Sequence, residues 1–69
     1  MVQSIEQQRR TWGNAIRKAR KEKGWTQEEL AHEWGNTLSY VQKIETGQKG
    51  NAETCRDLLA LIATLKKAS

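Results

Sequence analysis

The sequence predicts an all-α protein with four helices, or five. Helix-forming residues dominate, and no segment alternates apolar and polar residues with the period of two that marks a half-buried strand. Apolar residues recur instead at every third or fourth position, which is the spacing of one buried helix face. Three glycine-containing breaks divide the chain, at Gly24, at Gly35 and in the loop of residues 47–50. We therefore expect one compact domain over residues 1–69, with helices at about 5–23, 27–34, 38–45 and 52–66.

The first predicted helix begins at Ser4 and ends before Gly24. Ser4 and Gln7 have the spacing of a capping box, in which each side chain bonds the other residue's backbone N–H. Gly13 costs up to about 1 kcal/mol in a helix interior, so we expect another element to pack closely against it. The three tryptophans occupy apolar positions and are expected in the core rather than as stacking platforms for bases; they are Trp12, Trp25 and Trp34.

The second and third helices are short and are joined by a tight turn. Thr26 and Glu29 form the pattern of a capping box, and Thr37 can cap the third helix. Ala31 is small enough for two helices to cross steeply there, and Gly35 tolerates the positive φ that such a turn requires. A helix pair with a three-residue, glycine-containing turn is a helix-turn-helix unit, and the outer face of its second helix can enter a DNA major groove.

The fourth helix can be capped by Asn51, and its apolar face is wider than one core needs. Its core-facing positions are Cys55, Leu58, Leu59, Ile62 and Leu65. Leu61 lies outside this stripe, about 120° from its centre. Single exposed leucines are common on protein surfaces. In so small a chain, however, we interpret Leu58, Leu61 and Leu65 as an interface with a second copy.

Composition limits the class of protein. A chain of 69 residues buries only about 60% of its unfolded surface, so tight helix packing or self-association must supply stability. Cys55 is the only cysteine and lies far from the only histidine, His32, so we expect neither a disulfide nor a metal site, and no cofactor. No apolar run approaches the ~18 residues of a membrane span, and no signal-peptide pattern is visible. We expect a cytoplasmic protein with no membrane contact.

The net charge of +4 is unevenly distributed. Residues 1–25 carry seven bases and two acids, whereas residues 26–69 carry five bases and six acids. Such a basic segment is typical of a nucleic-acid partner, or it is simply a solvated helix face. Four bases of the first helix are open to both interpretations, as phosphate contacts or as solvated side chains: Arg9, Arg10, Arg17 and Lys18.

Over about residues 12–65 the sequence resembles the phage-repressor and Cro-like helix-turn-helix family, which is lambda-repressor-like and XRE-type. The matching residues are Ile16, Arg17, Arg20, the run from Gly24 to Ala31, Gly35, Val41, Ile44, Glu45, Gly47, Glu53 and Thr54. A lone Gln-x-x-Leu-Ala would be weak evidence, but the whole string at this spacing is specific. The resemblance implies a four-helix domain that binds DNA. Longer members add a fifth helix that often forms the dimer.

The resemblance also implies which side chains meet DNA. The residues it assigns to DNA are Gln27, Thr37, Leu38, Ser39, Tyr40, Gln42, Lys43 and Lys49. Among them, Gln27 and Lys49 correspond to backbone-contacting positions, and Lys43 can donate to guanine O6 and N7. Leu38 stands where relatives often have a polar base reader. Arg20 and Glu45 correspond to a structural ion pair.

The sequence is compatible with two functions. One is a sequence-specific regulator of transcription, a dimeric repressor that occupies a near-palindromic operator in double-stranded DNA. The other is an antitoxin-like or adaptor module that binds a protein through the C-terminal helix. An enzyme is not expected, because His32 has no visible nucleophile partner and no glycine-rich phosphate loop occurs.

Overall fold

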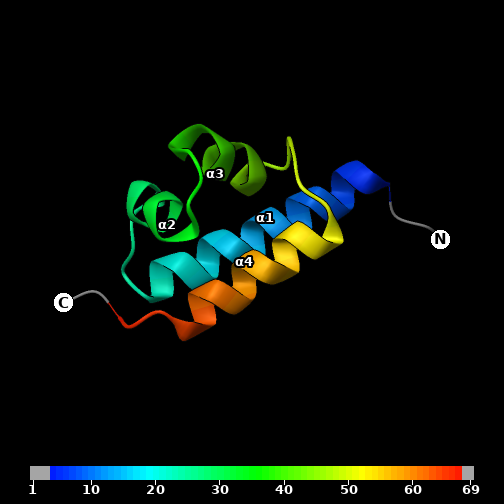
Figure 1. Ribbon diagram of the computed structural model, residues 1–69. Helices are drawn as coiled ribbons and strands as arrows, with labels where there is room; N and C mark the ends of the chain where they lie inside the picture. Colours follow the sequence, from blue (N-terminus) through cyan, green and yellow to red (C-terminus); the bar gives the residue numbers. More distant parts are fainter. Residues whose placement is uncertain (1–3, 68–69) are drawn as a thin grey trace.

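The computed structural model describes residues 4–67, and this part of the chain contains four helices and no strand. The helices are α1 (Ile5–Glu22), α2 (Gln27–Trp34), α3 (Leu38–Glu45) and α4 (Ala52–Thr64). α1 and α4 lie side by side and run in the same direction, and α2 and α3 pack along one side of this pair (Figure 1). The predicted all-α fold class is confirmed.

Every helix begins where the sequence places a capping side chain. The four N-caps are Ser4, Thr26, Thr37 and Asn51, and each accepts a hydrogen bond from a backbone N–H in the first turn of its helix. At α2 the capping box is complete, because Glu29 Oε1 also accepts from the Thr26 N–H at 2.9 Å. Each such cap stabilises its helix by about 1 kcal/mol, so the local sequence fixes these four starts.

Two helix ends differ from the prediction. α1 ends at Glu22, one residue early, and α4 ends at Thr64 instead of continuing to residue 66. Leu65 is already extended, with φ −74° and ψ 146°. The carbonyls after α4 bond to the corner between α1 and α2: Lys23 Nζ donates to Leu65 O at 2.8 Å, and the Trp25 indole N–H donates to Lys66 O at 2.7 Å. These tertiary hydrogen bonds replace the last turn of the helix.

The core draws on all four helices. Its buried side chains are Ile16, Leu30, Ala31, Val41, Ile44, Cys55, Leu58 and Ile62. Trp12 and Trp34 pack against this core while remaining partly exposed. The prediction for Trp25 was wrong, because its ring is not among the apolar side chains packed on the described core and its N–H binds the C-terminal segment.

The prediction that Leu58 forms a dimer interface was also wrong. Its side chain is 0% exposed and belongs to the core of its own chain. Leu61 and Leu65, the other two leucines of that prediction, are half-buried at the edge of the core. Of the three leucines in that prediction, only Leu61 and Leu65 retain surface that a second copy could cover.

The close packing expected at Gly13 is present. A Cβ at this position would lie 2.5 Å from Ile44 O and 2.7 Å from Glu45 O, which are backbone atoms at the end of α3. Because real Cβ atoms do not approach backbone so closely, only glycine lets α1 reach α3 here. This contact fixes how far α3 stands above α1. None of the helices in residues 4–67 has the length and apolarity needed to cross a membrane.

Candidate nucleic-acid interface

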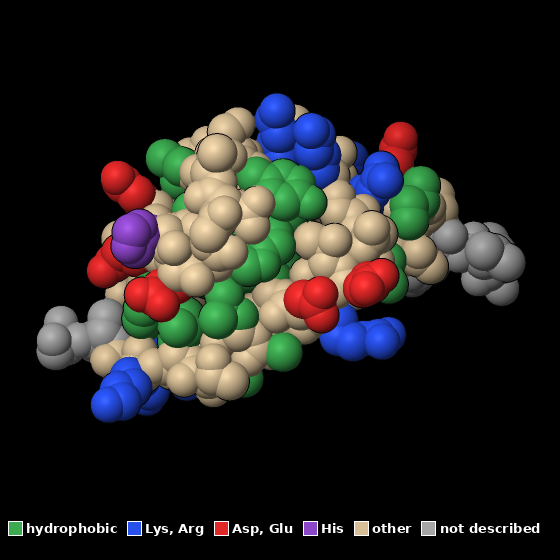
Figure 2. Space-filling model, in the orientation of Figure 1, with side chains coloured by type: hydrophobic (Ala, Val, Ile, Leu, Met, Phe, Trp, Pro, Cys, Tyr) green, Lys and Arg blue, Asp and Glu red, His purple; other side chains and the backbone are tan. Residues whose placement is uncertain are grey.

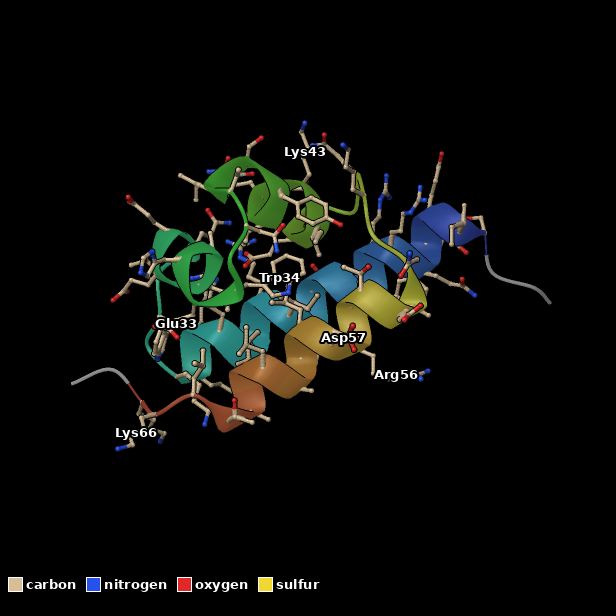
Figure 3. All side chains as sticks on the ribbon, in the orientation of Figure 1. Glu33, Trp34, Lys43, Arg56, Asp57 and Lys66 are labelled. Carbon is tan, nitrogen blue, oxygen red and sulfur yellow. The ribbon has the colours of Figure 1, made fainter. Side chains whose placement is uncertain are left out.

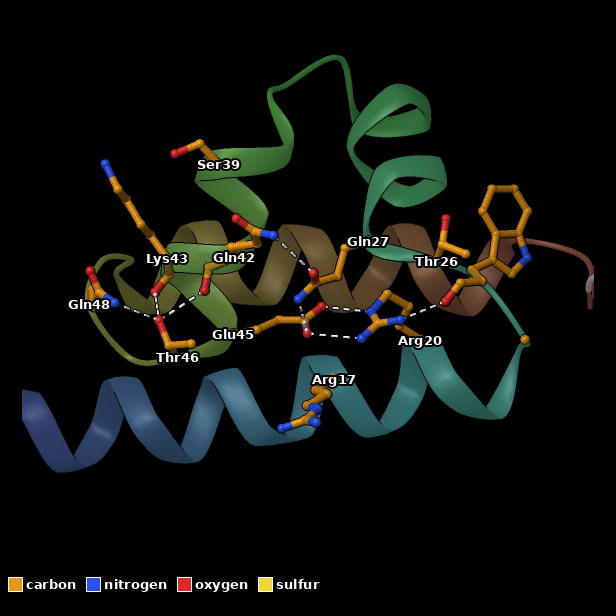
Figure 4. Close-up of a pocket in the computed structure, with 12 residues that line it drawn as sticks. Arg17, Arg20, Thr26, Gln27, Ser39, Gln42, Lys43, Glu45, Thr46 and Gln48 are labelled. Atoms are coloured by element: carbon orange, nitrogen blue, oxygen red, sulfur yellow. Dashed lines mark hydrogen bonds and ion pairs between the residues drawn. The ribbon is translucent and has the colours of Figure 1, made fainter.

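A buried ion pair holds α3 on the rest of the fold. Arg20 of α1 is 7% exposed and Glu45 of α3 is 5% exposed. Arg20 Nε lies 2.7 Å from Glu45 Oε2, and its Nη2 donates to Glu45 Oε1 at 3.0 Å, so the pair is bidentate (Figure 4). Arg20 Nη1 also donates to Trp25 O at 2.7 Å. The pair that the resemblance implied is therefore formed, and it joins α1, α3 and the segment that leads into α2.

Two glutamines extend this network from the interior to the surface. Gln27 Nε2 donates to Glu45 Oε1 at 3.1 Å, and Gln42 Nε2 donates to Gln27 Oε1 at 3.4 Å. An ionised carboxylate only accepts hydrogen bonds, so the amide nitrogen of Gln27 must face Glu45. Its oxygen then faces Gln42, an exposed residue of α3. The ion pair thus sets the orientation of the Gln27 amide beside α3.

An open cleft of about 800 Å³ lies between α1, the start of α2 and the outer side of α3. Four of the residues predicted to meet DNA line it, namely Gln27, Ser39, Gln42 and Lys43. Ser39 and Lys43 project away from the body of the molecule (Figure 4). The structure therefore brings half of the predicted set together on one surface.

The other four predicted residues lie elsewhere. Thr37 is the N-cap of α3, and its hydroxyl accepts from the Tyr40 N–H at 3.1 Å. The Tyr40 ring stacks on Trp34, with ring centroids 5.3 Å apart and planes 8° apart. Trp34 lies between the α2–α3 pair and α4 (Figure 3). Lys49 is exposed in the loop after α3, and Leu38 is 38% exposed at the start of α3.

Acidic side chains lie on the same part of the surface as Leu38. Leu38 lines a second hollow together with three glutamates of α2, which are Glu28, Glu29 and Glu33. A phosphate backbone would be repelled by these carboxylates. The surface around Leu38 is therefore a poorer place for DNA than the cleft beside Lys43.

The cleft contains two polar residues that sequence reasoning missed. Thr46 Oγ1 donates to Gln42 O at 2.9 Å, and Gln48 Nε2 donates to Thr46 Oγ1 at 3.1 Å. Both residues line the cleft. Thr46 follows Lys43 by three positions, so helical spacing places it on the same face and could have identified it. Gln48 lies in the irregular loop, where no periodic signal exists.

The mouth of the cleft carries positive charge. Four charged residues line it, and two of these, Arg20 and Glu45, neutralise each other. The remaining two are Arg17 and Lys43, both cations. Lys and Arg side chains gather along the edge above α3, whereas acidic side chains lie on α2 and on the visible face of α4 (Figure 2). The cleft can therefore bind an anionic ligand and offer amide and hydroxyl groups to it.

The clear pKa shifts occur outside the cleft. Hydrogen bonds from the Thr26 backbone and then from its side chain lower the pKa of Glu29, and burial raises the pKa of the Cys55 thiol. Within residues 4–67, no three His, Cys, Asp or Glu side chains are grouped as metal ligands would be.

Comparison with known protein families matches residues 16–63, more than half of the chain, to a family described as Helix-turn-helix. The matched segment includes the cleft residues and the Arg20–Glu45 pair. Comparisons with curated proteins and with solved structures gave no match.

Proposed function

Because the chain belongs to the lambda-repressor-like helix-turn-helix family, whose members are DNA-binding regulators of transcription, we propose that it is a sequence-specific repressor that acts as a dimer by occupying its operator. The observation that carries this proposal is the cleft. Arg17 and Lys43 supply charge for phosphates or guanines there, and the uncharged side chains of Ser39 and Gln42 on α3 line the same cleft. Family members are typically not enzymes, and the proposal includes no catalytic step.

In this proposal α3 enters the major groove and its exposed side reads base edges. Lys43 donates to guanine O6 and N7, Gln42 pairs with adenine N6 and N7, and Ser39 bonds either base type. Gln27, Thr37 and Lys49 are proposed to meet the sugar–phosphate backbone. Tyr40 and Leu38 are proposed to contact a phosphate or a thymine methyl at the margin of the site. Base contacts specify the sequence, while phosphate contacts set the register of the protein on DNA.

Dimerisation would let two α3 helices read a near-palindromic operator, with half-sites about 34–36 Å apart. Leu61 and Leu65 support this part of the proposal, because they leave apolar surface at the edge of the core. A dimer on such a site would block polymerase by occupancy, in the cytoplasm.

Selection of duplexes from a random pool, followed by gel-shift titration at several salt concentrations, tests the proposal. We expect one recovered sequence to bind at least 10³-fold more tightly than random DNA, as specific sites typically do. Lys43→Ala should relax preference at one base pair, whereas Lys49→Ala should weaken binding to all duplexes alike. Equal affinity for recovered and random duplexes would refute a sequence-specific repressor.

A second candidate, an antitoxin-like or adaptor module, is favoured by three partly exposed leucines, which are Leu59 and Leu61 of α4 and Leu65 directly after it. A protein partner could cover these side chains as well as a second copy could. Stable dimers in sedimentation measurements, together with specific DNA binding, would favour the repressor. A monomer without specific DNA binding would favour the module.

A further inference from the structure

The N-terminal half of α1 precedes the segment matched to the family. It nevertheless packs against the loop that follows α3. α1 is continuous from Ile5 to Glu22, whereas the match begins at residue 16. Arg9 Nε donates to Gly50 O at 2.8 Å. A Cβ on Gly47 would lie 2.8 Å from Arg10 Cγ and 3.2 Å from Arg10 Cα. The loop after α3 therefore rests directly on this half of α1.

Two arginines of α1 share the face that points toward α3 and this loop. Arg10 and Arg17 are seven residues apart, which is two helical turns, and so stand on the same side about 10 Å apart along the axis. Arg17 lines the cleft together with Lys43. The stem of Arg10 packs against Gly47, in the loop that also carries Lys49, and Arg10 is exposed. Cations thus continue from the cleft along α1.

The other bases of α1 are placed differently. The Nε of Arg9 is occupied by the Gly50 carbonyl, and Arg9 is only partly exposed. Lys18 is exposed and lies about 100° further around the helix than Arg17, on the side away from the cleft. The structure therefore separates Arg10 and Arg17 from the other two candidate phosphate contacts.

Charge also favours α1 over α2 as the side on which DNA extends. Beyond the α2 end of α3 lies the hollow lined by three glutamates, which would repel phosphates. Beyond its other side lie the cations of the cleft and of α1. A duplex whose groove holds α3 would be drawn toward α1.

We propose, on the premise that the chain binds duplex DNA, that Arg10 and Arg17 form a phosphate-binding ridge that extends the footprint beyond the bases read by α3. The ridge recognises the backbone and is indifferent to sequence. Each arginine neutralises one phosphate, and α1 sets their spacing. This ridge adds phosphate contacts to those that the short helix α3 can make by itself.

The test measures how affinity for a fixed 24-base-pair duplex depends on salt, for the full chain and its variants. Each neutralised phosphate contributes about 0.9 to the slope of log K against log salt concentration. We expect Arg10→Gln and Arg17→Gln each to reduce the slope by about 0.9, and the double variant by about 1.8. Lys18→Gln, the matched control on the same helix, should leave the slope unchanged.

Two further variants separate a phosphate contact from a structural role. Arg10→Lys and Arg17→Lys keep the charge, so they should restore most of the slope, whereas loss of packing would not be rescued in this way. Thermal unfolding should show that the glutamine variants remain folded. If folded Arg10→Gln and Arg17→Gln have the same slope as a wild-type chain that binds DNA, the ridge proposal is wrong and the proposed function is unaffected. Failure of the wild-type chain to bind any duplex would overturn the proposed function itself.

Discussion

At the scale of single residues, the Arg20–Glu45 pair both stabilises the fold and holds Gln27, which contacts the proposed DNA-reading residue Gln42. Removing two charges from water is costly, and their attraction offsets this only because the geometry is bidentate and each guanidinium nitrogen of Arg20 has a hydrogen-bond partner. Arg20 also bonds Trp25 O, and Glu45 also accepts from Gln27. No buried side-chain nitrogen or oxygen in the described residues lacks a hydrogen-bond partner. Loss of one charge would leave the other buried and unpaired.

Arg20→Met should therefore destabilise the fold by about 3–5 kcal/mol, because the Glu45 carboxylate would stay buried without its partner. Urea unfolding measures this loss. Arg17→Met, a charge removal at an exposed position of the same helix, should change stability by no more than about 0.5 kcal/mol. The double variant Arg20→Met with Glu45→Met should lose less than Arg20→Met alone. A double variant as unstable as the sum of both single changes would contradict the coupling.

Gln27→Met tests whether this glutamine positions Gln42. Methionine keeps the volume but removes both hydrogen bonds, so Gln42 should lose its fixed orientation. We expect weaker discrimination, by up to tenfold, at the one base pair that Gln42 is proposed to read, measured with duplexes substituted at each position. In a Gln42→Ala background the same change should have no such effect. A uniform loss on all duplexes would instead mark Gln27 purely as a phosphate contact.

At the scale of the elements, two local features decide where the helices of the motif lie. The capping box starts α2 at Thr26, and the glycine contact at Gly13 lets α3 lie on α1. The first is a property of neighbouring residues. The second depends on residues more than thirty positions apart, so the sequence indicates that Gly13 is special without saying what it touches.

Gly13→Ala should destabilise the protein by about 1–3 kcal/mol, as overpacking typically does, although alanine is the better helix former. The physical reason is the 2.5 Å approach to a backbone carbonyl, which no side-chain rotation relieves. Thermal or urea unfolding measures the change. Asn14→Ala, at an exposed neighbouring position, should be neutral or stabilising. Equal stability of Gly13→Ala and the wild type would show that α1 and α3 separate easily.

Acid should weaken the start of α2. Hydrogen bonds from Thr26 lower the pKa of Glu29, so its ionised form stabilises the folded state above the unfolded pKa, ordinarily about 4.3. That stability is lost as the pH falls through the lowered folded pKa. Glu29→Gln retains a hydrogen-bonding cap but carries no charge. The wild type should therefore be more stable than Glu29→Gln at pH 7, and the difference should shrink at pH 3. A difference independent of pH would contradict this account.

At the scale of the whole molecule, a fold of this size gains stability if it buries more apolar surface than its own core does. Leu58 is fully buried in its own core, whereas Leu61 and Leu65 remain at the rim. In the proposed dimer these two side chains would be covered. Such an interface would also place two recognition helices on one operator.

Leu61→Glu should convert the proposed dimer to a monomer and lower operator affinity, because a carboxylate cannot be buried there without a partner. Light scattering over a range of concentrations measures the association. Ala63→Glu, on the other side of α4, is the control and should leave the dimer intact. A wild-type chain that stays monomeric at high concentration, and on operator DNA, would show that no dimer forms.

The sequence by itself determined the features that depend on near neighbours. All four N-caps, the glycine turn at Gly35 and the outward face of α3 at Ser39 and Lys43 follow from residues within a few positions of one another. Helical periodicity and capping chemistry act over one or two turns, so these features can be predicted from the sequence.

Tertiary structure alone decided which of these faces meet. It buried Leu58, turned Trp25 toward the C-terminal segment, ended α4 at Thr64 and placed Leu38 beside glutamates. It also brought Arg17, Gln27 and Gln48 around the same cleft. Each outcome depends on contacts between residues distant in the chain, such as the 2.7 Å bond from Trp25 to Lys66. Local helix propensity does not predict such contacts, because they form and stabilise the protein only when the helices pack together.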